Sequence, residues 1–178
     1  MSPAPDGGEA ALDEAALEAL YSRLLAPLYN VAYRWVWHRE EARDLVQEAF
    51  VRLWRMRDRV RMETVEALVF RITVNLAANR RRQRKVWQWV TLDGVRGASA
   101  AAAAEEALTR AEEVTGLRAA IDALPEGLRR VLVLCDLGGL SYEQCGAVLG
   151  IPAGTVGSRR NTALRRLERA LGATGARP

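Results

Sequence analysis

The sequence has little of what a metal site or a disulfide-bonded fold requires. Its 178 residues include 2 cysteines and 1 histidine, whereas a structural zinc site needs about four Cys or His ligands. A disulfide framework needs more cysteines and usually a secreted context. We therefore expect Cys135 and Cys145 to be reduced and buried, and we expect no metal and no cofactor.

Long apolar runs are also missing. No segment approaches the roughly 20 apolar residues of a membrane span, and residues 1–11 contain no basic segment followed by an apolar stretch, so no signal peptide is visible. We expect a cytoplasmic protein that does not insert into membranes. Aromatic residues make up 6% of the chain, but 49% is hydrophobic, which suffices for small cores and argues against bulk disorder.

The first half of the chain has the pattern of a helical bundle. Apolar residues recur at helical spacing from Asp13 to Ala32, from about Glu41 to Met56 and from about Thr64 to Lys85. Three such stripes predict a small bundle over residues 13–86, preceded by a mobile tail at residues 1–12.

A change of composition separates this bundle from a second helical pattern. Residues 87–112 carry mostly small side chains and are expected to form a flexible linker. Residues 113–172 show four further helical stripes, followed by a C-terminal tail at residues 173–178. The sequence therefore predicts an all-α fold of two small helical domains, a three-to-four-helix bundle and then a four-helix domain, joined by the linker.

Turn and capping residues mark the helices of the second domain. Pro125 is expected to begin a helix that Gly138 ends. Ser141, with Gln144 three residues later, predicts a capping box at the next helix. The turn at residues 150–154 then leads into a final helix, and this arrangement predicts a helix-turn-helix.

A cationic cluster ends the third helix of the first domain. Five of the six side chains from Arg80 to Lys85 are cationic. Upstream, the spacing of Arg71, Asn75 and Asn79 places them on one face with Arg82, opposite the apolar stripe. Arginine neutralises phosphates and asparagine can pair with base edges, so this face favours nucleic acid. A solvated helix end that complements the helix dipole is the alternative.

Two more polar groupings stand out. Asp44, Gln47, Glu48 and Arg52 form a ridge on the second helix, which spacing alone describes as an ordinary solvated face. General acid–base catalysis at this ridge would need a nucleophile, a metal cluster or a nearby histidine, and the sequence places none there.

The segment from Thr155 to Asn161 occupies the first turns of the final helix, where a helix-turn-helix enters the major groove. Thr155 is expected to cap that helix.

Three segments resemble one family. ARDLVQEAFVRLW (residues 42–54), FRITVNLAANRRRQRK (residues 70–85) and the stretch from LPEGLRRVL to RRLERAL (residues 124–171) look like a bacterial sigma factor. The short two-domain layout is similar to the extracytoplasmic-function (ECF) group. The runs D-L-x-Q-E-x-F-x-x-x-W and P-x-G-T-V-x-S-R are specific, and both occur in the family's order.

The resemblance implies a function and a set of contacts. The protein would bind core RNA polymerase and direct promoter recognition, promoter melting and transcription initiation, under the control of an anti-sigma factor. It would act by binding and not as an enzyme. The polymerase-binding residues would be Asp44, Gln47, Glu48 and Arg52. The contacts to the downstream (minus 10) promoter DNA would be Arg71, Asn75, Asn79, Arg80, Arg81, Arg82, Arg84 and Lys85. The contacts to the upstream (minus 35) DNA would be Thr155, Ser158, Arg159, Arg160, Asn161 and Arg165.

Two other functions stay open at this point. A stand-alone helix-turn-helix transcription regulator would explain the second domain but would leave the first bundle and its polar ridge without a task. A nuclease with Asp44 and Glu48 holding a metal would need further acidic ligands at suitable spacing, and the sequence does not offer them.

Overall fold

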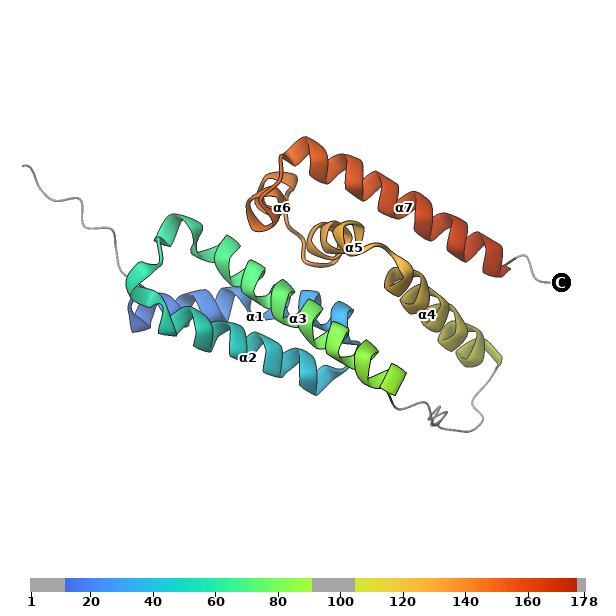
Figure 1. Cartoon of the computed structure of the whole chain (residues 1–178), viewed down its shortest axis with the longest axis horizontal. Coiled ribbons are helices and arrows are strands. Elements are labelled where there is room, and N and C mark those ends of the chain that lie inside the picture. Colours follow the sequence, from blue (N-terminus) through green and yellow to red (C-terminus); the bar gives the residue numbers. More distant parts are fainter. Residues whose placement is uncertain (1–11, 91–104, 176–178) are drawn as a thin grey trace, which may run out of the picture.

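All regular elements that the structure describes are helices (Figure 1). The computed structural model describes residues 12–90 and 105–175, with side chains for residues 12–84 and 113–172. Within these ranges the all-α prediction is confirmed. Most of the predicted tails, the linker interior and the side chain of Lys85 lie outside the described part.

The first half consists of three helices and two short turns. The helices are α1 (Glu14–Val36), α2 (Arg39–Arg55) and α3 (Val65–Val90), and the 3₁₀ turns η1 (Arg57–Arg59) and η2 (Met62–Thr64) join the last two. Helix α3 thus extends to Val90 and not only to Lys85.

The start of α1 is fixed by polar and apolar contacts together. The carboxylate of Asp13 accepts a hydrogen bond from the backbone N–H of Ala16 at 2.8 Å. Leu12, which we had assigned to the tail, is buried in the same apolar cluster that Leu17 packs against. These are the positions of a hydrophobic staple around an N-cap residue, so Leu12 belongs to the folded part.

The second half contains four α-helices and a π-helical turn. These elements are α4 (Glu105–Ala123), α5 (Glu126–Leu132), η3 (Val133–Leu137), α6 (Tyr142–Leu149) and α7 (Ala153–Gly175). The capping box of Ser141 and Gln144 is confirmed, because each side chain bonds the other residue's backbone N–H. Gly150 then adopts φ 68° and ends α6, a left-handed conformation that glycine tolerates at no steric cost.

The prediction that Thr155 caps the last helix is wrong. Helix α7 begins at Ala153, and the backbone N–H groups of Thr155 and Val156 donate to the carbonyl of Pro152 at 2.9 and 3.1 Å. Thr155 therefore lies inside the first turn, and Pro152 takes the place before the helix that we had given to Thr155.

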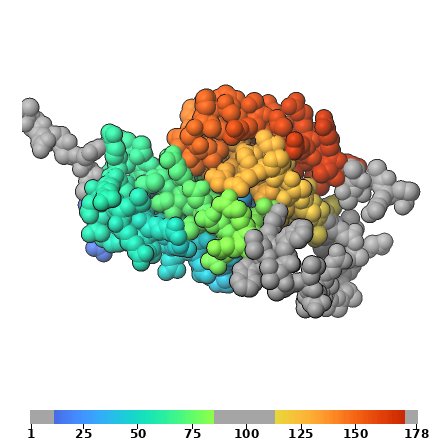
Figure 2. All heavy atoms as spheres, viewed as in Figure 1, coloured from blue at the N-terminus to red at the C-terminus, as the bar shows by residue number. Residues whose placement is uncertain are grey.

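The two halves pack against each other and share a core. In Figure 1 helices α1–α3 (blue to green) lie beside α4–α7 (yellow to red), and Figure 2 shows their atoms in contact. The largest apolar cluster runs through α1–α3 and continues into the second half. Its members from that half are Val131, Val133, Leu134, Cys145, Val148 and Val156.

Segment 131–134 explains why the core is continuous. Its four residues are all apolar and all buried. Val131, Val133 and Leu134 join the large cluster, whereas Leu132 joins a smaller one between α4 and α7. A helical segment that is apolar all round must be covered on more than one side, and the first half supplies the second cover.

Gly138 allows α1 to come close to this segment. A methyl group at Gly138 would lie 2.8 Å from Cγ2 of Val31 and 2.7 Å from the carbonyl oxygen of Leu134. Both distances are shorter than real contacts, so a side chain would push the halves apart.

We therefore expect Gly138→Ala to lower the free energy of unfolding by about 1–3 kcal/mol, as overpacking of a core does. Urea denaturation followed by circular dichroism measures the change. Gly172→Ala is the matched control, because Gly172 has open space around it on α7 and alanine there should stabilise the helix by about 0.5–1 kcal/mol. The same sign of change for both variants would contradict the packing argument.

Candidate functional site

The predicted polymerase-binding ridge lies on the outer face of α2. Asp44 and Gln47 are exposed, while the intervening Leu45 and Val46 are buried in the core. Glu48 accepts hydrogen bonds from Arg52, from Nη2 at 2.5 Å and from Nε at 3.1 Å. Asp44 and Gln47 make no side-chain hydrogen bond within the described residues, so this end of the ridge is open to a partner.

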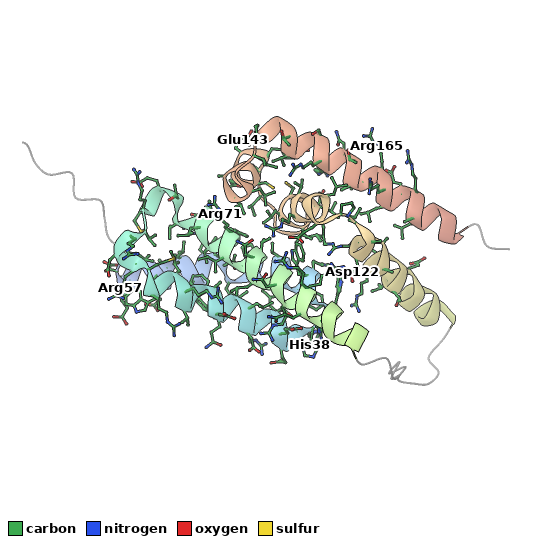
Figure 3. All side chains as sticks on the ribbon, viewed as in Figure 1. His38, Arg57, Arg71, Asp122, Glu143 and Arg165 are labelled. Atoms are coloured by element: carbon green, nitrogen blue, oxygen red, sulfur yellow. The ribbon has the colours of Figure 1, made fainter. Side chains whose placement is uncertain are left out.

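The predicted DNA face of α3 is turned toward the second half. Arg71 donates to the carbonyl of Val148 at 2.9 Å and to that of Ala147 at 2.6 Å. These carbonyls end α6, and Figure 3 shows Arg71 on the side of α3 that faces it. A cation at a helix C-terminus is a favourable contact.

The two asparagines of this face are engaged as well. Asn75 accepts a hydrogen bond from Nη1 of Arg130 at 3.1 Å, and Asn79 accepts one from Arg82. Arg82 also pairs with the carboxylate of Glu126 at 3.4 Å. Arg130 donates to the same carboxylate, and this bond, followed by the nearby charges, lowers the pKa of Glu126 below its ordinary value. The face that we assigned to nucleic acid is therefore covered by α5 and α6.

The remaining arginines of the cationic cluster are held by two carboxylates. Arg81 donates to the backbone carbonyl of Asp122 at 2.8 Å and lies 3.3 Å from its carboxylate. Arg80 and Arg84 lie 3.6 and 3.2 Å from the carboxylate of Glu41. Each arginine of the cluster is thus paired with a carboxylate of the fold, and Arg80 and Arg84 share that of Glu41.

The predicted upstream-DNA residues lie together on the first turns of α7, but their surroundings differ. Arg160 bonds both carboxylate oxygens of Asp136, with 3.0 Å from Nε to each, and this bond raises the pKa of Arg160. It ties α7 to η3. Arg165 is exposed and points away from the body of the protein in Figure 3. The further residues of this set are Thr155, Ser158, Arg159 and Asn161.

Sequence reasoning missed a buried arginine. Arg129 is 2% exposed, and it donates to the backbone carbonyls of Ile121, Asp122 and Leu124 at 2.9, 2.6 and 2.7 Å. Burial, followed by the charge of Arg81, lowers the pKa of Arg129 to about 10. A signal was present, because helical spacing places this residue on one face with Leu132 and Val133.

Two tryptophans at the end of α1 were missed too. The ring of Trp35 lies 5.4 Å from Cζ of Arg129. Trp37 adopts φ 55°, which is rare for a residue with a side chain, and it packs against the small apolar cluster of the second half. Arg118 of α4 lies 5.1 Å from the Trp37 ring. Aromatic–arginine contacts thus join the halves.

Within the described residues, neither the cysteines nor any cluster of metal-ligating side chains adds a site. Cys145 is buried and Cys135 half-buried, and both are free thiols. Burial raises the pKa of each, which makes a thiol unreactive. In the described ranges, no group of three or more His, Cys, Asp or Glu side chains is placed to hold a metal ion, and no helix there is long and apolar enough to cross a membrane.

Comparison with known proteins accounts for both halves. Residues 20–86 match the family model of sigma-70 region 2, and residues 116–167 match that of sigma-70 region 4. The chain is 30% identical over 169 residues to the RNA polymerase sigma-H factor of Pseudomonas aeruginosa, covering 89% of this chain and 88% of that protein. It is 38% identical over 134 residues to the ECF RNA polymerase sigma factor SigE of Mycolicibacterium smegmatis, covering 74% of this chain and about half (52%) of that protein.

Two solved structures share the fold. One is CnrH in complex with the cytosolic domain of CnrY, with a TM-score of 0.67, 24% identity and 90% of each chain covered. The other is the sigma factor RpoE in complex with the anti-sigma factor NepR from Bartonella quintana, with a TM-score of 0.62, 23% identity, and 87% of this chain and 96% of that chain covered.

These matches define a sigma-70-type protein built from regions 2 and 4. The chain belongs to the sigma-70 family of RNA polymerase sigma factors, in its extracytoplasmic-function group. The region 2 match also explains the first helical bundle, for which the alternative of a stand-alone helix-turn-helix regulator offered no function.

We expect Arg129→Met to lower the free energy of unfolding by about 2–4 kcal/mol, because three buried carbonyl groups lose their donor. Urea denaturation measures this loss. Arg130→Met is the matched control, since the neighbouring arginine is less buried and pairs mainly with Glu126; its loss should stay below about 1 kcal/mol. Equal losses of unfolding free energy in the two variants would show that the three hydrogen bonds of Arg129 contribute no more to stability than the exposed pair of Arg130.

The pKa of Glu126 predicts an acid-sensitive contact. Its folded value lies below the ordinary 4.5, so its contribution to stability is complete above that value and disappears as the pH falls through the folded value. Glu126→Gln should therefore be less stable than the parent at pH 7, by under about 1 kcal/mol for a half-exposed pair. The urea midpoints of the two proteins should converge as the pH falls below 4.5, and a constant difference would contradict the assignment.

Proposed function

We propose that this protein is a promoter-specificity subunit of RNA polymerase that acts in the cytoplasm. It binds the core enzyme, recognises and melts promoter DNA, and leaves the chemistry of transcription to the polymerase. The observation that carries the proposal is the order of the two family matches along one chain, with region 2 on α1–α3 and region 4 on α4–α7.

The contact with core polymerase is assigned to the ridge Asp44, Gln47, Glu48 and Arg52. This assignment is supported by the exposure of Asp44 and Gln47 on α2, because the opposite face of this helix is buried in the core. Such a surface can bind a partner without any rearrangement of the fold.

The contacts with DNA are assigned to two surfaces. Region 2 presents the arginines and asparagines of α3, together with Lys85, to the downstream promoter element. There the protein's contacts to single-stranded bases must offset the free-energy cost of unstacking those bases. Region 4 presents the first turns of α7 to the upstream element. Arg159 and Arg165 support this assignment best, because neither forms an ion pair within the described residues.

Binding of promoter DNA to α3 requires that the halves separate. Arg71, Asn75 and Arg82 all contact α5 or α6 in the present arrangement. A phosphate or a base cannot take these positions while the contacts persist. An anti-sigma factor is the partner that would keep the halves in this arrangement, and the solved complex of RpoE with NepR is a precedent for such a pair.

Run-off transcription tests the proposal. Purified core polymerase is incubated with genomic fragments, with and without the protein, and the 5′ ends of the transcripts are mapped. New start sites behind a shared pair of upstream and downstream motifs are expected. No binding to core polymerase would contradict the proposal.

The ridge can be tested separately with Asp44→Arg. We expect at least ~10-fold weaker binding to core polymerase, since reversal of a charge at a complementary interface introduces repulsion. Glu18→Arg on the exposed side of α1 is the control and should bind normally. Affinity measured by biolayer interferometry with the two variants distinguishes a specific ridge from a general effect of net charge; equal affinities would refute the assignment.

A further inference from the structure

Arg160 occupies an inward position on α7. The buried residues of this helix are Val156, Ala163 and Leu167. Helical spacing places residue 160 on the same stripe, four positions after the first of them and three before the second. Along residues 153–165 the exposed residues form a different stripe, which consists of Gly154, Ser158, Asn161 and Arg165. Arg160 is therefore turned toward the body of region 4 and not toward the exposed side of the helix.

The guanidinium of Arg160 is paired with the carboxylate of Asp136 in η3. Its Nε lies 3.0 Å from each carboxylate oxygen, and its Nη2 donates to Oδ1 as well. The two side chains are 29% and 25% exposed. The charges of the pair cancel, and a phosphate beside the cation would also lie near the anion. Because the affinity of a protein for phosphates depends on its unpaired positive charge, this pair offers DNA little attraction.

Tyr142 at the start of α6 is a further partner of Arg160. Its side chain forms a hydrogen bond with the guanidinium. Its ring lies over Gly157 of α7, where a methyl group would be 3.3 Å from Cε2. A residue without a side chain at position 157 thus allows the ring to lie close to α7. Asp136, Arg160 and Tyr142 together join η3, α7 and α6, the elements of the helix-turn-helix.

We infer that Arg160 is a positioning residue of the upstream-DNA surface and does not itself contact DNA. Its pair with Asp136 fixes α7 against η3, and Tyr142 extends this contact to α6. The exposed stripe that includes Ser158 and Arg165 is thereby held in one orientation. This inference rests on the proposed function of region 4, and it changes the role of Arg160 from a DNA contact to a support for the residues that make such contacts.

The salt dependence of DNA binding tests the inference. The full chain is assembled with core polymerase, and its affinity for promoter fragments that carry the mapped upstream motif is measured at several salt concentrations. Each lost phosphate contact reduces the steepness of log affinity against log salt by about 0.9. Asp136→Asn/Arg160→Gln removes both charges and keeps the net charge. We expect the slope of the parent, with an affinity at least ~5-fold lower because α7 is less firmly held.

Arg165→Gln is the matched control for this variant. It removes one arginine from the same helix, but from the exposed stripe, where we assign contacts with DNA. Its affinity should fall and its slope should become less steep by about 0.9. The comparison separates an arginine that contacts phosphate from one that positions the helix.

Exchange of the two charges tests positioning directly. Asp136→Arg/Arg160→Asp restores an ion pair between η3 and α7 with the opposite polarity, and we expect its affinity to lie within ~2-fold of the parent's. The single variant Arg160→Asp brings two carboxylates together and should bind at least ~10-fold more weakly. If Arg160 contacted DNA, the exchange could not restore binding, since a carboxylate repels phosphate.

Two results would overturn the inference while the parent complex still binds the upstream motif. The first is a slope for Asp136→Asn/Arg160→Gln that is reduced as much as that of the control. The second is a parental affinity and slope for this variant, which would leave the pair a role in stability alone. If the exchanged variant does not fold, as circular dichroism would show, these two results decide. A parent complex that does not bind the upstream motif would contradict the proposed function itself, and this inference with it.

Discussion

The contact on which the arrangement depends is that of the Arg129 guanidinium with the end of α4. A buried charge is costly unless its hydrogen bonds are satisfied, and three carbonyl groups at the helix C-terminus, where the helix dipole is negative, satisfy most of them. The same group lies over Trp35 of α1. One side chain thus joins α5 to α4 and both to the first half, and Arg81 of α3 donates to the same carbonyl of Asp122.

This constraint bears directly on promoter binding. The α3 face that we propose for promoter DNA turns its arginines and asparagines toward α5 and α6, where they bind the carboxylate of Glu126 and carbonyl groups near the end of α6. In the proposed DNA complex, phosphates and base edges would have to replace these protein carboxylates and carbonyls. The two uses of the face exclude each other, so the inter-half contacts and DNA compete for one set of side chains. By contrast, the ridge on α2 and Arg165 on α7 are available in this arrangement.

Signals within a few residues of the chain, such as capping residues and turn glycines, predicted most helix boundaries. They could not predict contacts between residues far apart in the sequence. The capping box of Ser141 and the helix stop at Gly138 depend on neighbours in the chain, and both are confirmed. Thr155 was misplaced because Pro152 supplies the carbonyl that begins α7. Periodicity could tell that segment 131–134 is buried, but not that α1 covers it. Pairing of Arg71 with residues 147 and 148 joins positions far apart in the chain, and no spacing rule within one helix can reveal such a pair.

Separation of the halves has a consequence that follows from the shared core. Val131, Val133 and Leu134 are buried between the halves, and opening would return them to water, which is unfavourable in proportion to the apolar area exposed. The aromatic–arginine contacts of Trp35 and Trp37 would be lost at the same time. An open form therefore needs an apolar surface that replaces α1 against η3, and a polymerase surface that covers this segment would supply that replacement. If core polymerase, once bound at the ridge, also covers segment 131–134, the proposed release of Arg71, Asn75 and Arg82 for DNA would be coupled to that second contact.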